Sequence, residues 1–255
     1  MILKKLMLII TLFASVNFQF TVQAKNIGLC IVATGKYIQF VQPLIISAQK
    51  FFCTNHLVKY FIFTDGELPV LDASMVKIEQ KRLGWPYDTM MRFDMYSRSN
   101  AILSTMDYLF ACDADMRFVD HVGDEILSER VATQHPGFVN QRGSYETNSF
   151  STAYIASHEG NYYFAGGFYG GTATEFLNIA RVNIDHIKKD LEQNYIAVWH
   201  DESHLNRYFI DHKPTLVLSP AYCYPEKWTL PYPKKLLALD KDHAAMRETN
   251  QIHTK

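Results

Sequence analysis

The stretch Leu109–Phe118, which reads Leu-Phe-Ala-Cys-Asp-Ala-Asp-Met-Arg-Phe, decides the fold of this chain. The apolar run from Tyr108 to Cys112 predicts a buried strand that ends in two carboxylates one residue apart, Asp113 and Asp115. Because a buried strand cannot carry two unpaired charges, we expect both at its end, close to positive charge. In open α/β sheets ligands bind at that end, where paired carboxylates suit a hard divalent cation that also binds phosphate. An Asp-x-Asp pair alone also fits an ordinary polar strand end.

The composition fits one large domain or two closely associated halves. The chain has 255 residues, of which 48% are hydrophobic, enough for a substantial core. A net charge of −1 gives no indication of a nucleic-acid partner. The 17 Phe and 15 Tyr are mostly core residues, although a carbohydrate groove uses the same types. We expect buried thiols, rather than a zinc site or a disulfide framework, at the four cysteines, Cys30, Cys53, Cys112 and Cys223.

The N-terminal segment differs in kind from the rest. Lys4 and Lys5 precede an unbroken apolar stretch over residues 6–16, and Val22-Gln23-Ala24 resembles a cleavage site. This fits a secretory signal better than a membrane span, with an uncleaved anchor over residues 6–22 as the alternative. We therefore expect residues 1–24 to be a signal peptide or signal anchor and residues 25–255 to form one catalytic domain.

Strand and helix patterns alternate along that domain. Thr172 and Glu175 are placed to form a capping box at the start of a long amphipathic helix. The alternation predicts an α/β fold with a parallel, nucleotide-type half. The sequence has no Gly-rich loop followed by Lys-Ser/Thr, so it does not fit a phosphate-loop ATPase. The other expected helices are Tyr37–Phe52, Met90–Ser104 and Asp201–Ile210, and the expected strands are Ile27–Ala33, Val58–Phe63, Tyr108–Cys112 and Thr215–Leu218.

Three further clusters have both a functional and a structural interpretation. After the first strand, a turn and the ring of Tyr37 could hold a base. Arg92, on a predicted helix, suits a carboxylate or a sugar hydroxyl, or else forms a surface ion pair. The segment 165–171 has four glycines, which indicate close approach of a ligand or another backbone, or a bulge.

The segment Trp199–His204 is the densest in titratable groups. Asp201 could cap the helix that follows. His200 and His204 are four residues apart and could bind zinc, but without a third ligand at a recognisable spacing we favour a catalytic carboxylate here.

Together these clusters resemble glycosyltransferase family 6, which contains the blood-group A/B and α1,3-galactosyl transferases. The resemblance runs from about Ile27 to about Arg247. It implies a GT-A fold, in which a single Rossmann-like nucleotide-binding half is fused to an acceptor-binding half, and retention of anomeric configuration with a UDP-sugar donor held by Mn²⁺. The matching pieces are Trp85 with Arg92, Asp107-Tyr108-Leu109 leading into Asp113-x-Asp115-Met116, Asp120-His121-Val122-Gly123, His135-Pro136-Gly137-Phe138, Tyr162-Tyr163, Ala197–Asn206 and His212-Lys213-Pro214-Thr215.

The resemblance also implies a role for individual residues. Asp113 and Asp115 match positions that hold Mn²⁺ and the diphosphate, with Asp113 also near the donor sugar. Glu202 matches the carboxylate that acts as nucleophile or stabilises an oxocarbenium-like transition state. The other matches are Ala33 and Tyr37 for uridine, Arg92 and Asp201 for the donor hexose, Lys241 and Arg247 for closure over the diphosphate, and His135 and Trp199 for the acceptor.

The resemblance guides the choice of donor and acceptor. Many bacterial members carry Asn-x-Asn, so the Asp-x-Asp here resembles the metal-dependent, animal-type branch. Ala165 and Gly167, which flank Gly166, match positions that face carbon 2 of the donor hexose, and their small size favours UDP-GalNAc over UDP-Gal. Where the family often has an acidic acceptor contact, this chain has Pro225 with Glu226 adjacent.

We therefore expect a Mn²⁺-dependent enzyme that transfers GalNAc (or Gal) in α1,3 linkage to a galactose-terminated glycan of a glycolipid or glycoprotein. The alternatives are a UDP-Gal-specific α1,3-galactosyltransferase, a lectin-like relative with little catalysis, and a hydrolase of nucleotide sugars. A Golgi-type lumen offers both export and UDP-sugar, whereas a bacterial periplasm lacks the donor. We accordingly expect a lumenal catalytic domain, secreted or attached as a single-pass type II membrane protein.

Overall fold

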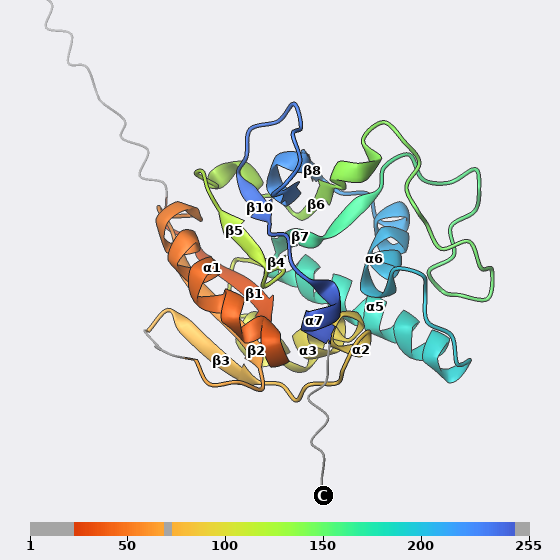
Figure 1. Cartoon of the computed structure of the whole chain (residues 1–255), viewed down its shortest axis with the longest axis horizontal. Coiled ribbons are helices and arrows are strands. Elements are labelled where there is room, and N and C mark those ends of the chain that lie inside the picture. The colour runs from red at the N-terminus through yellow and green to blue at the C-terminus, as the bar shows by residue number, and fades with distance from the viewer. Residues whose placement is uncertain (1–22, 69–72, 248–255) are drawn as a thin grey trace, which may run out of the picture.

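The computed structural model describes residues 23–68 and 73–247, which form a twisted sheet with helices on both faces (Figure 1). A seven-stranded sheet has the order β3-β2-β1-β4-β7-β6-β8, and a three-stranded sheet has the order β5-β10-β9. The strands are β1 (Asn26–Val32), β2 (Leu57–Thr64), β3 (Met75–Glu79), β4 (Tyr108–Cys112), β5 (Met116–Phe118), β6 (Arg130–Gln134), β7 (Phe164–Thr172), β8 (Leu216–Leu218), β9 (Tyr224–Pro225) and β10 (Leu236–Ala238).

The helices cover the large sheet in two layers. Successive side chains of a strand point to opposite faces, so β1 contributes Ile27, Leu29 and Ile31 to one core cluster and Cys30 to the other. Helix α1 packs in the first cluster, and α3, α5 and α6 pack in the second. The α-helices are α1 (Ile38–Phe51), α2 (Tyr87–Met90), α3 (Arg92–Arg98), α4 (Asn100–Leu103), α5 (Ala173–Glu192), α6 (His200–Asp211) and α7 (His243–Arg247).

The sheet has a parallel half and a mixed half. Strands β3, β2, β1 and β4 are parallel, as the nucleotide-type prediction requires, whereas β7 runs antiparallel to both β4 and β6. The expected α/β fold is therefore confirmed, with a GT-A-like arrangement in which the two halves meet at β4 and β7.

The glycines of β7 serve both structural purposes expected of them. A Cβ on Gly170 would lie 2.3 Å from the carbonyl oxygen of Leu109, so the neighbouring backbone excludes any side chain there. Between β6 and β7 the register breaks after Ala132–Tyr169, and Thr133 pairs with Ala165. The segment Gly166–Phe168 consequently bulges out of the β6 ladder.

Two local expectations need correction. The helix expected over Met90–Ser104 is broken at Met91 and Ser99, where the backbone departs from helical geometry, although hydrogen bonds continue across both breaks. The capping box is half formed, because Thr172 accepts from the Glu175 N–H at 3.4 Å but its own N–H already donates to a carbonyl. The Glu175 carboxylate therefore accepts hydrogen bonds from Arg130 and Tyr208 instead.

In the described ranges, no helix has the length and apolar character needed to cross a membrane. The expected signal or anchor falls on residues 1–24, of which 1–22 lie outside the described residues.

Candidate active site

The two carboxylates of the Asp-x-Asp pair lie where the sequence places them, directly after β4. The backbone N–H of Asp113 donates to the Gly167 carbonyl at 2.9 Å, which ties the end of β4 to the bulge in β7. Asp115 is buried and its carboxylate contacts the ammonium of Lys241. Burial and the charge of Asp113 raise the pKa of Asp115, and Lys241 opposes them. Two like charges are thus held close together beside one lysine.

Arg92 connects this pair to a second acidic group. It is the first residue of α3 and only 6% exposed, so the surface ion pair considered for it is wrong. Its Nη1 lies 2.9 Å from Asp113 Oδ1 and its Nε 3.0 Å from Asp201 Oδ2. Burial by itself lowers the pKa of Arg92, but the charges of Asp201 and Asp113 more than offset this effect. The pKa is raised overall, so the guanidinium stays charged.

Helix α6 supplies two neighbouring acids in its first turn, Asp201 and Glu202. Asp201 forms an ion pair with Arg92. Helix α6 begins at His200, one residue before Asp201, so Asp201 is not the N-cap residue of this helix. Burial raises the pKa of Asp201 to about 6, against the opposing effect of Arg92. Glu202 Oε2 accepts a hydrogen bond from the Gly166 N–H at 2.8 Å, yet burial raises its pKa to about 7.

Three of these acids, Asp113, Asp115 and Glu202, line two neighbouring cavities, whereas Asp201 lines neither. Asp113, Asp115 and Lys241 contribute to both, and Glu202 lies only in the larger one. The larger cavity, about 380 Å³, is lined by Asp113, Asp115, Met116, His135, Ala165, Gly167, Glu202, Cys223, Pro225, Glu226, Lys227, Trp228, Ala238, Leu239, Asp240, Lys241 and His243. The smaller, about 100 Å³, is lined by Val32, Thr34, Tyr37, Asp88, Thr89, Arg92, Asp113, Ala114, Asp115 and Lys241.

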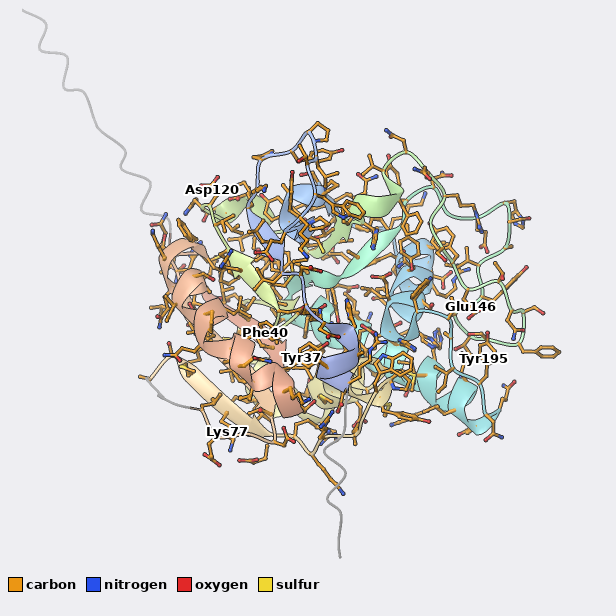
Figure 2. The ribbon with its side chains drawn as sticks, viewed as in Figure 1. Tyr37, Phe40, Lys77, Asp120, Glu146 and Tyr195 are labelled. Atoms are coloured by element: carbon orange, nitrogen blue, oxygen red, sulfur yellow. The ribbon has the colours of Figure 1, made fainter. Side chains whose placement is uncertain are left out.

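Of the two residues expected to hold uridine, one lies at the smaller cavity. Tyr37 lines it, with the Lys241 ammonium 5.7 Å from its ring centre. Tyr37 lies beside α7 (Figure 2). Ala33 is fully buried in the core, and its neighbours Val32 and Thr34 line the cavity in its place.

The expected acceptor residues are divided between the larger cavity and the surface. His135 and Glu226 line the cavity together with Ala165. Burial lowers the pKa of His135 to about 4, so its ring is neutral. Trp199 is half exposed and donates its indole N–H to Ser144 Oγ at 2.9 Å, outside the residues that line either cavity.

Arg247 and the two histidines of α6 contact other side chains in the structure. The guanidinium of Arg247 lies 4.4 Å above the ring of Trp85, and Arg247 lines neither cavity. The His200 ring packs edge-on to the same Trp85, whereas His204 is buried with its Nε2 3.7 Å from Asp190. Within residues 23–68 and 73–247, no group of three or more His, Cys, Asp or Glu is arranged to hold a metal ion.

Sequence reasoning missed several cavity residues. Cys223 is partly buried and lines the larger cavity, unlike the three fully buried thiols, but nothing local in the sequence distinguishes it. Lys227 and Trp228 lie in the connection between β9 and β10, whose short strands give almost no periodic pattern. Adjacency to Glu226 was the available signal for both.

A mostly parallel sheet whose central strand ends in Asp-x-Asp, with further carboxylates across a cavity, defines a GT-A-like glycosyltransferase. The chain belongs to glycosyltransferase family 6, whose family model matches residues 13–252. The resemblance stated from the sequence is thereby confirmed.

The chain is also similar to several named proteins. It is 38% identical to histo-blood group ABO system transferase 1 of Rattus norvegicus over 248 residues, 91% of this chain and 71% of the relative. It is 35% identical to globoside alpha-1,3-N-acetylgalactosaminyltransferase 1 of Homo sapiens over 238 residues, 87% and 68% of the two chains. The O-antigen biosynthesis glycosyltransferase WbnI of Escherichia coli is 28% identical over 225 residues, 85% and 95% of the two chains.

Proposed function

We propose that this chain is a retaining, Mn²⁺-dependent transferase that moves GalNAc (or Gal) from a UDP-sugar, in α1,3 linkage, to a galactose-terminated glycan. One observation carries the proposal: Asp113 and Asp115 line the same cavity as Glu202. Charge stabilisation for a departing diphosphate and for a cationic sugar is thus available on either side of one space. The printed name of the human relative, an alpha-1,3-N-acetylgalactosaminyltransferase, agrees with it.

The residues present fit a divalent cation. Asp113 and Asp115 are hard oxygen ligands in one cavity, and their mutual repulsion is an energy that a divalent cation would relieve. They would hold Mn²⁺, which when bound supplies positive charge for the diphosphate. Lys241, which lines the same cavity, is placed to add a second positive charge on the departing UDP.

The remaining side chains bind and orient the two substrates. Arg92 and Asp201 are locked together by their ion pair and would present a fixed edge to the donor hexose hydroxyls. Glu202, in its ionised form, would stabilise positive charge on the sugar ring. On the acceptor side, His135 with its neutral ring and Glu226 line the cavity wall, and Trp199 offers an exposed ring outside it.

The choice of GalNAc rests on the space beside Gly167. A Cβ built there would lie 3.3 Å from Cys223 Sγ and 3.5 Å from Asp113 Oδ2, so even one added carbon would contact the cavity wall. With no side chain at Gly167 and only a methyl group at Ala165, this wall of the larger cavity is not extended inward, which supports room for an acetamido group within the cavity.

A screen of UDP-sugars against a glycan array, with and without Mn²⁺, tests the proposal. We expect transfer from UDP-GalNAc to galactose-terminated glycans only with the metal. Binding of glycans without UDP release would indicate the lectin-like alternative, and UDP release unaffected by acceptor would indicate a hydrolase. Either result contradicts the proposed function.

We also propose that the domain works in a lumen supplied with UDP-sugar, reached through the apolar N-terminal segment. Sequencing the mature N-terminus distinguishes the two routes. Lys25 as the first residue indicates a cleaved signal, and Met1 indicates an anchor. A cytosolic, unprocessed protein would contradict both.

A further inference from the structure

Tyr163 has a polar group for which the fold provides no ordinary partner. It precedes β7, its side chain is fully buried, and among the described residues its hydroxyl makes no hydrogen bond of standard geometry. Leaving a buried hydroxyl unpaired costs free energy, so such a group is expected to have a use. The rings of His135, Phe138 and Tyr145 surround it at centroid distances of 5.6, 4.9 and 5.2 Å.

The ring of Tyr163 is fixed in position by its surroundings. A Cβ built on Gly143 would lie 2.0 Å from Tyr163 Cγ, so only glycine allows that loop to lie flat against the ring. The Tyr163 carbonyl accepts a hydrogen bond from the His135 N–H at 2.8 Å. The hydroxyl therefore cannot turn elsewhere to find a partner.

Glu202 is the charged neighbour on this side: its carboxylate accepts from the N–H of Gly166, three residues after Tyr163, and it lines the same cavity as His135, whose ring packs against Tyr163. Burial raises the pKa of Tyr163 most, followed by the charge and the hydrogen-bonding capacity of Glu202. In the opposite direction, the Gly166 N–H and then the Tyr163 hydroxyl lower the pKa of Glu202 against the larger effect of burial. The other titratable groups that face Glu202 are Asp201 on the same helix, Asp113 at the end of β4 and the thiol of Cys223.

Asn206 fixes the two partners relative to each other. Its side-chain amide donates to the carbonyls of Phe164 and Glu202 at 2.8 and 2.9 Å and accepts from the Phe164 N–H at 2.9 Å. The residue after Tyr163 and the backbone of Glu202 are thus clamped by one buried side chain.

We propose that Tyr163 is a positioning residue for Glu202: its hydroxyl donates a hydrogen bond to the carboxylate and keeps it ionised and aimed at the sugar as positive charge develops there. No proton is transferred in this role. The inference rests on the proposed function, because it needs Glu202 to face a reacting sugar.

The test compares Tyr163→Phe with Tyr145→Phe, which removes a hydroxyl from a neighbouring ring in the same aromatic cluster. The Tyr145 hydroxyl donates to the Tyr162 carbonyl rather than to Glu202. We expect Tyr163→Phe to lower kcat about tenfold or more with little change in KM for the donor, as for loss of a hydrogen bond to a charged group. The acidic limb of its pH profile should move up by about one unit, because Glu202 loses a donor that favours its ionised form. Tyr145→Phe should change neither.

A second readout does not depend on turnover. The carboxylic C=O infrared band of Glu202, assigned by subtracting the spectrum of Glu202→Gln, should titrate at higher pH in Tyr163→Phe than in the wild type. An unchanged band position and an unchanged pH profile would overturn the inference while leaving wild-type transfer intact. Failure of the wild type to transfer sugar would instead overturn the proposed function, and the infrared titration would still decide whether Tyr163 supports the ionised carboxylate.

Discussion

Replacing Arg92 by methionine tests whether the buried guanidinium holds the site together. Methionine keeps much of the length of the side chain but removes the contacts to Asp113 at 2.9 Å, Asp201 at 3.0 Å and the Gly166 carbonyl at 3.1 Å. Asp201 then stays buried without a counter-charge. Removing one partner of a buried ion pair costs about 3–5 kcal/mol.

A loss of that size is easily measured. For a domain of this length each kcal/mol lowers Tm by about 2–4 °C, so we expect a fall of about 6–20 °C. The deficit should shrink as the pH is lowered, because Asp201, whose pKa is about 6 with Arg92 present, becomes protonated below that value. Once Asp201 is neutral, the wild type keeps only the Arg92–Asp113 ion pair, and the variant no longer buries a charge at Asp201.

Differential scanning calorimetry at about pH 8 and about pH 5 checks both statements. Arg98→Met is the matched control on the same helix, since Arg98 is 57% exposed and its pair with Asp94 is an exposed one expected to be worth less than about 1 kcal/mol. The double variant Arg92→Met/Asp201→Asn should recover part of the loss. A deficit for Arg92→Met as small as that of Arg98→Met, or one independent of pH, would refute the reasoning.

Three further predictions concern the acidic groups and the donor pocket. EDTA should abolish transfer and Mn²⁺ restore it, while Asp115→Asn should lower kcat about a hundredfold or more; full activity in excess chelator would contradict this. Gly167→Ala should move the ratio of kcat/KM values from UDP-GalNAc toward UDP-Gal by about 10–200-fold, and a wild-type preference for UDP-Gal would show that the glycine serves only the backbone. The folded-state pKa of Glu202, about 7, lies above its ordinary value of 4.5, so folding is penalised once the pH rises through that range. Glu202→Gln should therefore raise the free energy of unfolding at about pH 8, by at most about 3 kcal/mol, and give no gain near pH 4.5 in urea titrations. An equal gain at both pH values would rule out the charge as its cause.

The sequence predicts the elements with strong periodic signals well, whereas β6 and β7, although buried, were not among the expected strands. The strands β1, β2 and β4 and the helices α1 and α6 lie within about two residues of the expected ranges, and α5 begins directly after the expected cap, Thr172. Strand β3 was missed because its residues are partly exposed and show no clean alternation, and β9 and β10 are too short to give a pattern. Their positions depend on pairing with distant segments, which local sequence does not encode.

For the site, the residues at the ends of long elements could be predicted, and those placed by loops could not. Asp113 and Glu202 line one cavity, and they lie directly after the end of β4 and in the first turn of α6. The ion pairs of Arg92 could not be predicted from the sequence, because its local pattern fits a surface position equally well. Only the folded structure shows that Arg92 is buried. Tyr163 reads as another core aromatic residue, and only its surroundings show that its hydroxyl approaches a carboxylate.

The bulge in β7 separates the part of the strand that holds the sheet together from the part that lines the larger cavity. Gly170 and Gly171 cannot change, because neighbouring backbone atoms occupy the space of any side chain. Gly166 and Gly167 lie outside the β6 ladder, and the nearest atoms to a Cβ there belong to side chains. Substitutions in the bulge would therefore reshape the cavity wall, and under the proposed function the space beside the sugar, without loss of strand pairing. If the cavity holds the donor as proposed, single substitutions in the bulge can change the sugar that is transferred while the scaffold stays folded.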